Sequence, residues 1–226
     1  MQGTRTDYQL ALQQLTDSAL PTGAFAHSLG FETYIDRGVV RDELTFSTWL
    51  TVFVRHQLVY TDGLAVRLLY EGGDIGVLDG MLTGCLLAKE GREASIKMGG
   101  RLLDIGTEVF PSPELDAYRS LVREDRAAGH QPLAFAVVAR SLGVPLREAL
   151  AAYFFATATS LTQNAVRAIP LGQNAGQRVL RHAHDAVAAA VDAVPHLGWD
   201  DFGAVIPGLE ISQMQHERQR ARMFMS

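Results

Sequence analysis

Residues 146–166 are apolar on almost every side when they are placed on a helix. A helix without a polar face has to be buried on all sides, so other elements must surround it. Its most apolar run, 149–158, is shorter than the ~20 residues that a membrane span requires. We therefore expect this segment to form the central helix of a globular protein and predict no membrane association.

The remaining chain also shows helical spacing of apolar residues, and alternation typical of strands is hard to find. Asp42 is placed to cap a helix, Gly38 to end one in a left-handed conformation, and Pro145 to begin one. No Ser- or Pro-rich linker divides the 226 residues. We predict an all-α fold in which residues 1–226 form a single-domain compact bundle of roughly ten helices, with 210–226 as a polar tail. Outside 146–166, helices are expected at 24–37, 42–58, 63–71, 74–89, 91–109, 113–128 and 174–192.

Composition and charge reduce the range of functions that we expect of this protein. Twenty basic and twenty-five acidic residues give a formal charge of -5, which disfavours nucleic-acid binding. Cys85 is the single cysteine, so no internal disulfide can form. The first residues lack the apolar core of a signal peptide, and we expect a cytoplasmic protein.

Motifs of common enzymes are missing. Neither Lys89 nor Lys97 lies in the Gly-Lys-Ser/Thr context of a phosphate-binding loop. His216-Glu217 begins like a zinc-protease motif, but the position of the second histidine is Arg220. We predict no catalytic residues, no metal site and no cofactor. An alternative is an all-α hydrolase or ligand-binding enzyme that uses His130, His216 and Glu217 around a pocket.

Three segments have unusual composition. Residues 20–32 contain a Pro-x-Gly turn, which is either a plain connection or a display of Phe25 and His27 as an exposed contact pair. Residues 170–177 contain a second such turn, followed by Gln173 and Gln177 one helical turn apart. Residues 216–226 alternate arginines with Met and Phe, types enriched at protein interfaces, which favours a binding tail over a frayed end.

Taken in order, these segments resemble the UreF family of urease accessory proteins. The resemblance extends over residues 20–226 and rests on five motifs. They are Leu20-Pro21-x-Gly23 with Ser28-x-Gly30-x-Glu32; Met98-Gly99; Gly129-His130-x-Pro132; Pro170-Leu171-Gly172-Gln173 with Gly176-Gln177; and His216-Glu217-x-Gln219-x-x-Arg222-x-Phe224-x-Ser226. The family usually has an aromatic residue where His27 stands here.

The resemblance implies an all-α protein without catalytic activity that forms a homodimer. It also implies a maturation chaperone that bridges the urease-binding partner UreD (also called UreH) and the GTPase UreG during GTP-dependent nickel insertion into the urease apoprotein. The expected partner-binding residues are Pro21, Gly23, Phe25, His27, Ser28, Glu32, Gly172, Gln173, Gln177, His216, Glu217, Arg218, Gln219, Arg222 and Phe224.

A mechanistic hypothesis concerns the tail. We expect it to be poorly ordered alone and to become ordered when UreD binds. Arg222 is then expected to donate hydrogen bonds to carbonyls of the 20–30 turn and to stiffen it as a landing surface for UreG.

Overall fold

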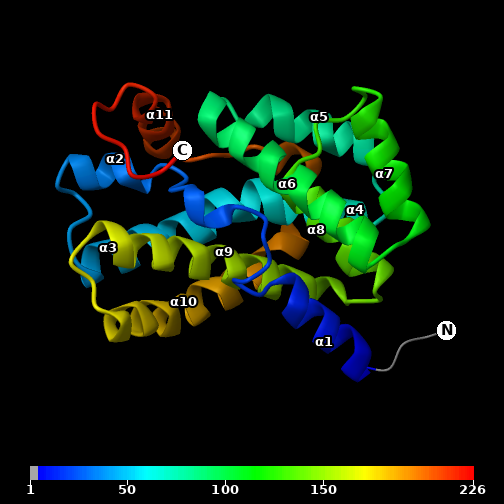
Figure 1. Ribbon diagram of the computed structural model, residues 1–226, viewed down its shortest axis with the longest axis horizontal. Helices are drawn as coiled ribbons and strands as arrows, with labels where there is room; N and C mark the ends of the chain where they lie inside the picture. Colours follow the sequence, from blue (N-terminus) through cyan, green and yellow to red (C-terminus); the bar gives the residue numbers. More distant parts are fainter. Residues whose placement is uncertain (1–4) are drawn as a thin grey trace.

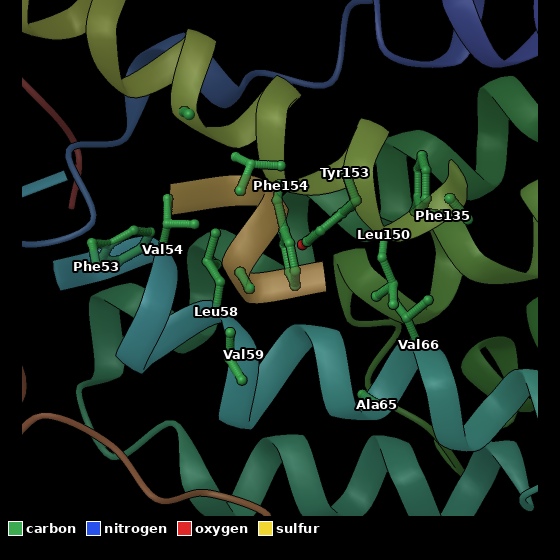
Figure 2. Packing of buried hydrophobic residues seen from close by; sticks show 14 of the residues in the cluster. Phe53, Val54, Leu58, Val59, Ala65, Val66, Phe135, Leu150, Tyr153 and Phe154 are labelled. Atoms are coloured by element: carbon green, nitrogen blue, oxygen red, sulfur yellow. The ribbon is translucent and has the colours of Figure 1, made fainter. Parts of the chain in front are cut away.

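Helix α9 (Leu146–Ala168) lies at the centre of the fold (Figure 1), but it is not buried on all sides as expected, since Phe155, Ala156 and Ser160 on one face are half-buried. It packs most extensively on α10 (Gln173–Ala193) and also contacts α8 (Gln131–Ser141) and the long helix that contains η2 (Phe53–Gly63). Figure 2 shows Phe154 and Leu150 of α9 pointing toward Leu58 and Val66 of that long helix. Phe154 is fully buried.

The computed structural model describes residues 5–226, and within them every regular element is a helix and none is a strand. Ten helices are present if α3, η2 and α4 are counted as one, so the all-α prediction is confirmed. The elements not yet given are α1 (Arg5–Leu15), η1 (Ala24–Ala26), α2 (Phe31–Asp36), α3 (Glu43–Val52), α4 (Leu64–Tyr70), α5 (Ile75–Cys85), α6 (Lys89–Val109), α7 (Pro113–Arg123), η3 (Val194–His196), η4 (Trp199–Asp201) and α11 (Pro207–His216).

Residues 43–70 form one continuous helix, where the sequence predicted two. Asp42 caps it as expected, since its side chain accepts a hydrogen bond from the Thr45 amide. The predicted break near Gly63 does not occur. A Cβ on Gly63 would lie 2.6 Å from the ring of Phe154 and 3.0 Å from Val194. Gly63 therefore serves close packing against α9, and the segment before it takes up a π-helical form.

The helix expected at 24–37 is interrupted. A short 3₁₀ turn, η1, is followed by Leu29 and Gly30, both with positive φ, and α2 begins only at Phe31. A Cβ on Gly30 would lie 2.8 Å from Gln213 Cγ of α11. Gly30 thus allows both the left-handed turn and the close approach of α11.

Two of the family motifs meet at the contact between α6 and α8. A Cβ on Gly99 of α6 would lie 1.9 Å from the carbonyl oxygen of Gly129, so only glycine fits there. The buried carboxylate of Asp79 accepts hydrogen bonds from the amides of Ala128, Gly129 and His130 and from the Tyr118 hydroxyl. These motifs therefore hold the turn before α8 in place.

A second carboxyl, that of the half-buried Asp62, lies against the central helix. Tyr153 of α9 donates a hydrogen bond to Asp62 of η2, with 2.7 Å between Oη and Oδ2. Burial raises the pKa of Asp62 to about 6, and the hydrogen bonds from Tyr153 and Thr61 offset this only in part. At neutral pH the folded protein therefore contains an unfavourable, partly desolvated carboxylate at Asp62.

Asp62→Asn is expected to stabilise the protein above pH 6 and to change little near pH 4. Below the ordinary pKa of 3.8 the Asp62 carboxyl is protonated in both the folded and the unfolded protein. As the pH rises from there through about 6, the carboxyl ionises more readily in the unfolded protein, so the free energy of unfolding falls. Each pKa unit corresponds to ~1.4 kcal/mol, so the expected gain is about 3 kcal/mol at neutral pH. Urea unfolding at the two pH values measures it. Asp185→Asn, at an exposed site on α10, is the matched control. An equal effect of Asp62→Asn at both pH values would contradict the assignment.

Candidate functional site

The last ten residues, 217–226, which we call the tail, run from the end of α11 back along α2 to the η1 turn (Figure 1). The sequence predicted a tail from residue 210, but residues 210–216 belong to α11. Helix α11 packs on α2 and more lightly on α6. The tail therefore lies on the body of its own chain, which differs from the poorly ordered tail that we expected.

Glu32 on α2 is the main attachment point of the tail. Its Oε1 accepts a hydrogen bond from the amide of Met223 at 2.6 Å, and its Oε2 accepts one from the amide of Phe224 at 3.1 Å. Its Oε2 also lies 2.8 Å from His216 Nε2. Glu32 is only 9% exposed. Hydrogen bonds to a buried charge are stronger than neutral ones, so this carboxylate fixes the path of the backbone.

The ring of His216, at the end of α11, lies between a carboxylate of α2 and a carboxylate of α6. Its ring is fully buried, and its Nδ1 lies 2.6 Å from Glu90 Oε2 of α6. The other carboxylate oxygen of Glu90 accepts a hydrogen bond from Arg222 at 2.7 Å. We call Glu32, His216, Glu90 and Arg222 the tail lock. In this chain alone Arg222 donates to the Glu90 carboxylate, whereas the hypothesis expects it to donate to carbonyls of the 20–30 turn once UreD is bound.

The end of the tail pairs with the backbone of the η1 turn. The Met225 amide donates to the Ala26 carbonyl at 2.7 Å, and the Ser28 amide donates to the Ser226 carbonyl at 2.5 Å. His27 Nδ1 lies 2.8 Å from Ser226 Oγ. Burial, and then the charge of Lys97, lower the pKa of His27. The imidazole is therefore neutral at physiological pH and bonds to the serine as an uncharged group.

Phe224 is the apolar anchor of the tail. It is 4% exposed and packs against Phe31, with 5.6 Å between the ring centroids. The guanidinium of Arg167, from α9, lies 5.5 Å from the centroid of the Phe224 ring, a cation–π arrangement. Arg167 also donates a hydrogen bond to the Phe25 carbonyl. Met223 and Met225, on either side of Phe224, are 54% and 57% exposed.

The structure brings one part of the predicted site together. His27, Ser28, Glu32, His216 and Phe224 are all buried where the tail meets α2 and the η1 turn. Phe25 is half-buried and His27 is 6% exposed, so the two do not form an exposed pair. Gln219 reaches Thr33, and the other predicted residues here are exposed: Pro21, Gly23, Glu217, Arg218 and Arg222.

The second predicted segment lies elsewhere. Gly172, Gln173 and Gln177 are exposed at the start of α10. This turn lies beside α3, whereas the tail lies beside α2 (Figure 1). No described contact joins these three residues to the tail.

Four residues that hold the tail or the neighbouring residues 27–29 had no signal in the sequence. Glu90 of α6 accepts a hydrogen bond from Arg222. Arg167 of α9 lies over the ring of Phe224. Asn164 of α9 donates to the His27 carbonyl at 2.8 Å, and Gln213 of α11 donates to the Leu29 carbonyl at 3.1 Å. Each lies far from its partner in sequence, so helical periodicity could not reveal it.

The histidines of the predicted alternative site lie in two separate networks. In residues 5–226 there is no group of three or more His, Cys, Asp or Glu residues that could hold a metal ion. His130 has Thr83 and Ser95 on its two ring nitrogens, and His216 lies between two carboxylates in a separate network. The predicted hydrolase alternative needs these histidines in one pocket with Glu217, which is exposed. Within the same residues, no helix is both long and apolar enough to cross a membrane.

Fold and site together define an all-α protein built around a docked tail and a helical framework. Comparison with known proteins shows to which family the chain belongs. The family model UreF matches residues 40–184. A urease accessory protein UreF of Paenarthrobacter aurescens is 78% identical over 97% of this chain and 98% of its own length. Those of Arthrobacter sp. and Corynebacterium efficiens are 75% and 47% identical, over 97% and 100% of both chains.

The chain therefore belongs to the UreF family of urease accessory proteins. The homologous proteins are named accessory proteins and not enzymes. The prediction that this protein is not an enzyme is therefore confirmed, and the alternative of a hydrolase is wrong.

Proposed function

We propose that this urease accessory protein acts as a bridge between UreD and the GTPase UreG during GTP-dependent nickel insertion into the urease apoprotein. In this proposal the tail and residues 21–32 form one contact surface, and the turn at 170–177 forms a second. The protein itself contributes shape and contacts, and the GTPase supplies the nucleotide chemistry. A homodimer remains a prediction from the family resemblance.

The observation that supports the first surface most directly is the docked tail. Residues far apart in sequence, 26–32 and 216–226, lie side by side through backbone hydrogen bonds and the tail lock. Fixing a segment before it meets a partner reduces the entropy that association costs. The buried contacts also hold Met223 and Met225 outward, and methionine adapts well to different protein surfaces.

The spacing of the two surfaces supports a bridging role. Gly172, Gln173 and Gln177 of this turn are exposed next to α3, and the tail lies next to α2. Two separate contact surfaces on one rigid helical body suit a protein that holds two others in a fixed relation. A single-partner inhibitor or a small-molecule enzyme needs only one such surface.

Arg222→Ala is expected to weaken co-purification with UreD and UreG much more than Arg218→Ala. Arg222 is held to Glu90 at 2.7 Å, whereas Arg218 is an exposed arginine four residues earlier on the same segment. Because the Arg222 side chain is 41% exposed, loss of this ion pair costs up to about 1 kcal/mol, or up to about fivefold in affinity if tail position governs binding.

Co-expression of each variant with UreD, UreG and urease, followed by affinity purification and titration of the isolated complex, measures the difference. Circular dichroism of both variants serves as the folding control. Equal recovery of partners by Arg222→Ala and Arg218→Ala would overturn the role of the tail in assembly. Gln173→Ala tests the second surface, and the proposal expects loss of one partner with retention of the other.

A further inference from the structure

Leu29 has a backbone conformation that leucine rarely adopts. Its φ is +50°, in the left-handed region, and Gly30 follows with a φ of +99°. In that region the Cβ of an L-residue crowds a carbonyl oxygen, so glycine and, less often, asparagine and aspartate are the residues that enter it readily. For leucine the left-handed conformation is about five- to thirtyfold less populated than the right-handed one. Such strain persists only where the surrounding structure holds it in place.

Two helices hold the backbone at and before this strained residue. Gln213 of α11 donates a hydrogen bond from Nε2 to the Leu29 carbonyl at 3.1 Å. A Cβ on Gly30 would lie 2.8 Å from Gln213 Cγ, so α11 packs directly on the backbone of the turn. Asn164 of α9 holds the His27 carbonyl, two residues before Leu29, at 2.8 Å. The central helix therefore fixes the start of the turn, and α11 fixes the left-handed pair.

The tail holds the residues between these two contacts. The Met225 amide donates to the Ala26 carbonyl at 2.7 Å, and the Ser28 amide donates to the Ser226 carbonyl. Ser28 is fully buried. If α11 and the tail moved away together, these backbone groups and the Leu29 carbonyl would lose the partners that come from residues 207–226. The contacts that oppose relaxation of Leu29 therefore belong to the C-terminal segment.

We infer that residues 28–30 and 207–226 open and close as one unit, which we call the docking unit, and that the strain at Leu29 makes this unit open more readily than the helical bundle beneath it. Leu29 is strained while the docking unit is closed and relaxes when it opens, so the strain lowers the stability of the closed state. The docking unit overlaps the first proposed contact surface. Its opening is a property of the chain by itself, so the inference goes beyond the proposed bridging role.

Glycine and alanine at position 29 separate strain from packing. Both remove the leucine side chain, but only glycine adopts a positive φ readily. Leu29→Gly is therefore expected to slow hydrogen exchange of the Ser28 and Met225 amides by up to about tenfold relative to Leu29→Ala, because relief of strain exceeds the extra entropy that glycine loses on closing. Hydrogen-exchange NMR of the full-length chain, corrected for intrinsic rates, measures it. In the unmodified chain, the two amides should exchange together and faster than the buried amides of α8.

Asp125 supplies the control for strain elsewhere. It is the other residue besides glycine with a positive φ in residues 5–226, at +55°, and it follows α7, far from α11 (Figure 1). Asp125→Gly should stabilise the protein in urea relative to Asp125→Ala and leave exchange of the Ser28 and Met225 amides unchanged, since its strain remains when the docking unit opens.

A second pair of variants covers failure to fold. Leu29→Asn and Leu29→Thr repeat the comparison with polar side chains, because asparagine tolerates the left-handed region and β-branched threonine does not. Equal exchange of the Ser28 and Met225 amides in the glycine and alanine variants, or in the asparagine and threonine variants, would overturn the inference. Exchange of these amides at the rate of the α8 core would overturn it as well.

Discussion

Replacing Glu32 by alanine is expected to release the tail from the body of the protein. The substitution leaves the amides of Met223 and Phe224 without their acceptor, and it leaves His216 with one carboxylate in place of two. Removal of one partner from a buried ionic network costs about 3–5 kcal/mol. The ratio of docked to released tail should therefore fall by more than ~100-fold. Phe224, now 4% exposed, would become accessible to solvent.

Trypsin provides the measurement. The Arg222–Met223 bond is protected because the Met223 amide is bound to Glu32, and Arg222 is bound to Glu90. Mass spectrometry of brief digests should show much faster cleavage after Arg222 in Glu32→Ala. Glu217→Ala is the matched control, since Glu217 is an exposed glutamate at the start of the same segment. If both variants are cleaved at the rate of the unmodified chain, Glu32 does not hold the tail.

Replacing Gly99 by alanine is expected to be among the most destabilising single changes in the molecule. The added methyl group would lie 1.9 Å from the Gly129 carbonyl oxygen and 2.7 Å from the Gln131 amide nitrogen. Both are backbone atoms in the turn that Asp79 holds, so neither can move aside as a side chain could. Overpacking commonly costs ~1–3 kcal/mol, and a clash with fixed backbone should reach or exceed ~3 kcal/mol. Urea unfolding measures the loss.

The neighbouring residue supplies the control. Gly100 lies on the same helix, and a Cβ there would meet nothing within 4 Å. Gly100→Ala is therefore expected to stabilise the protein by up to ~1 kcal/mol, because alanine favours the helix more than glycine does. Opposite signs at adjacent positions would show that the loss at Gly99 comes from the contact with α8. Equal effects at both positions would contradict this reading of the contact.

Both changes act on segments that carry family motifs, but in different ways. Gly99 and His130 belong to the contact between α6 and α8, so their motifs stabilise the framework. Glu32, His216 and Phe224 position the tail. A loss of partner binding in Gly99→Ala should therefore accompany loss of structure, whereas in Glu32→Ala the helical content should remain.

The sequence by itself determined the helical class, the central place of α9 and several helix ends. These follow from local properties: the apolar circumference of 146–166, the cap at Asp42 and the left-handed turn at Gly38. The sequence motifs also contain Glu32, His216 and Phe224, but they do not show which residues these three contact. Helix periodicity and capping act over a few residues, so they can be read along the chain.

Only the tertiary structure decided how distant segments pair. It turned 43–70 into one helix by packing Gly63 against Phe154, and it interrupted the helix expected at 24–37 where α11 approaches Gly30. It also made Glu90 the partner of both His216 and Arg222, more than 120 residues away. The stability of such contacts depends on burial and on charges that meet in space, and neither is set by the residues next to them in sequence.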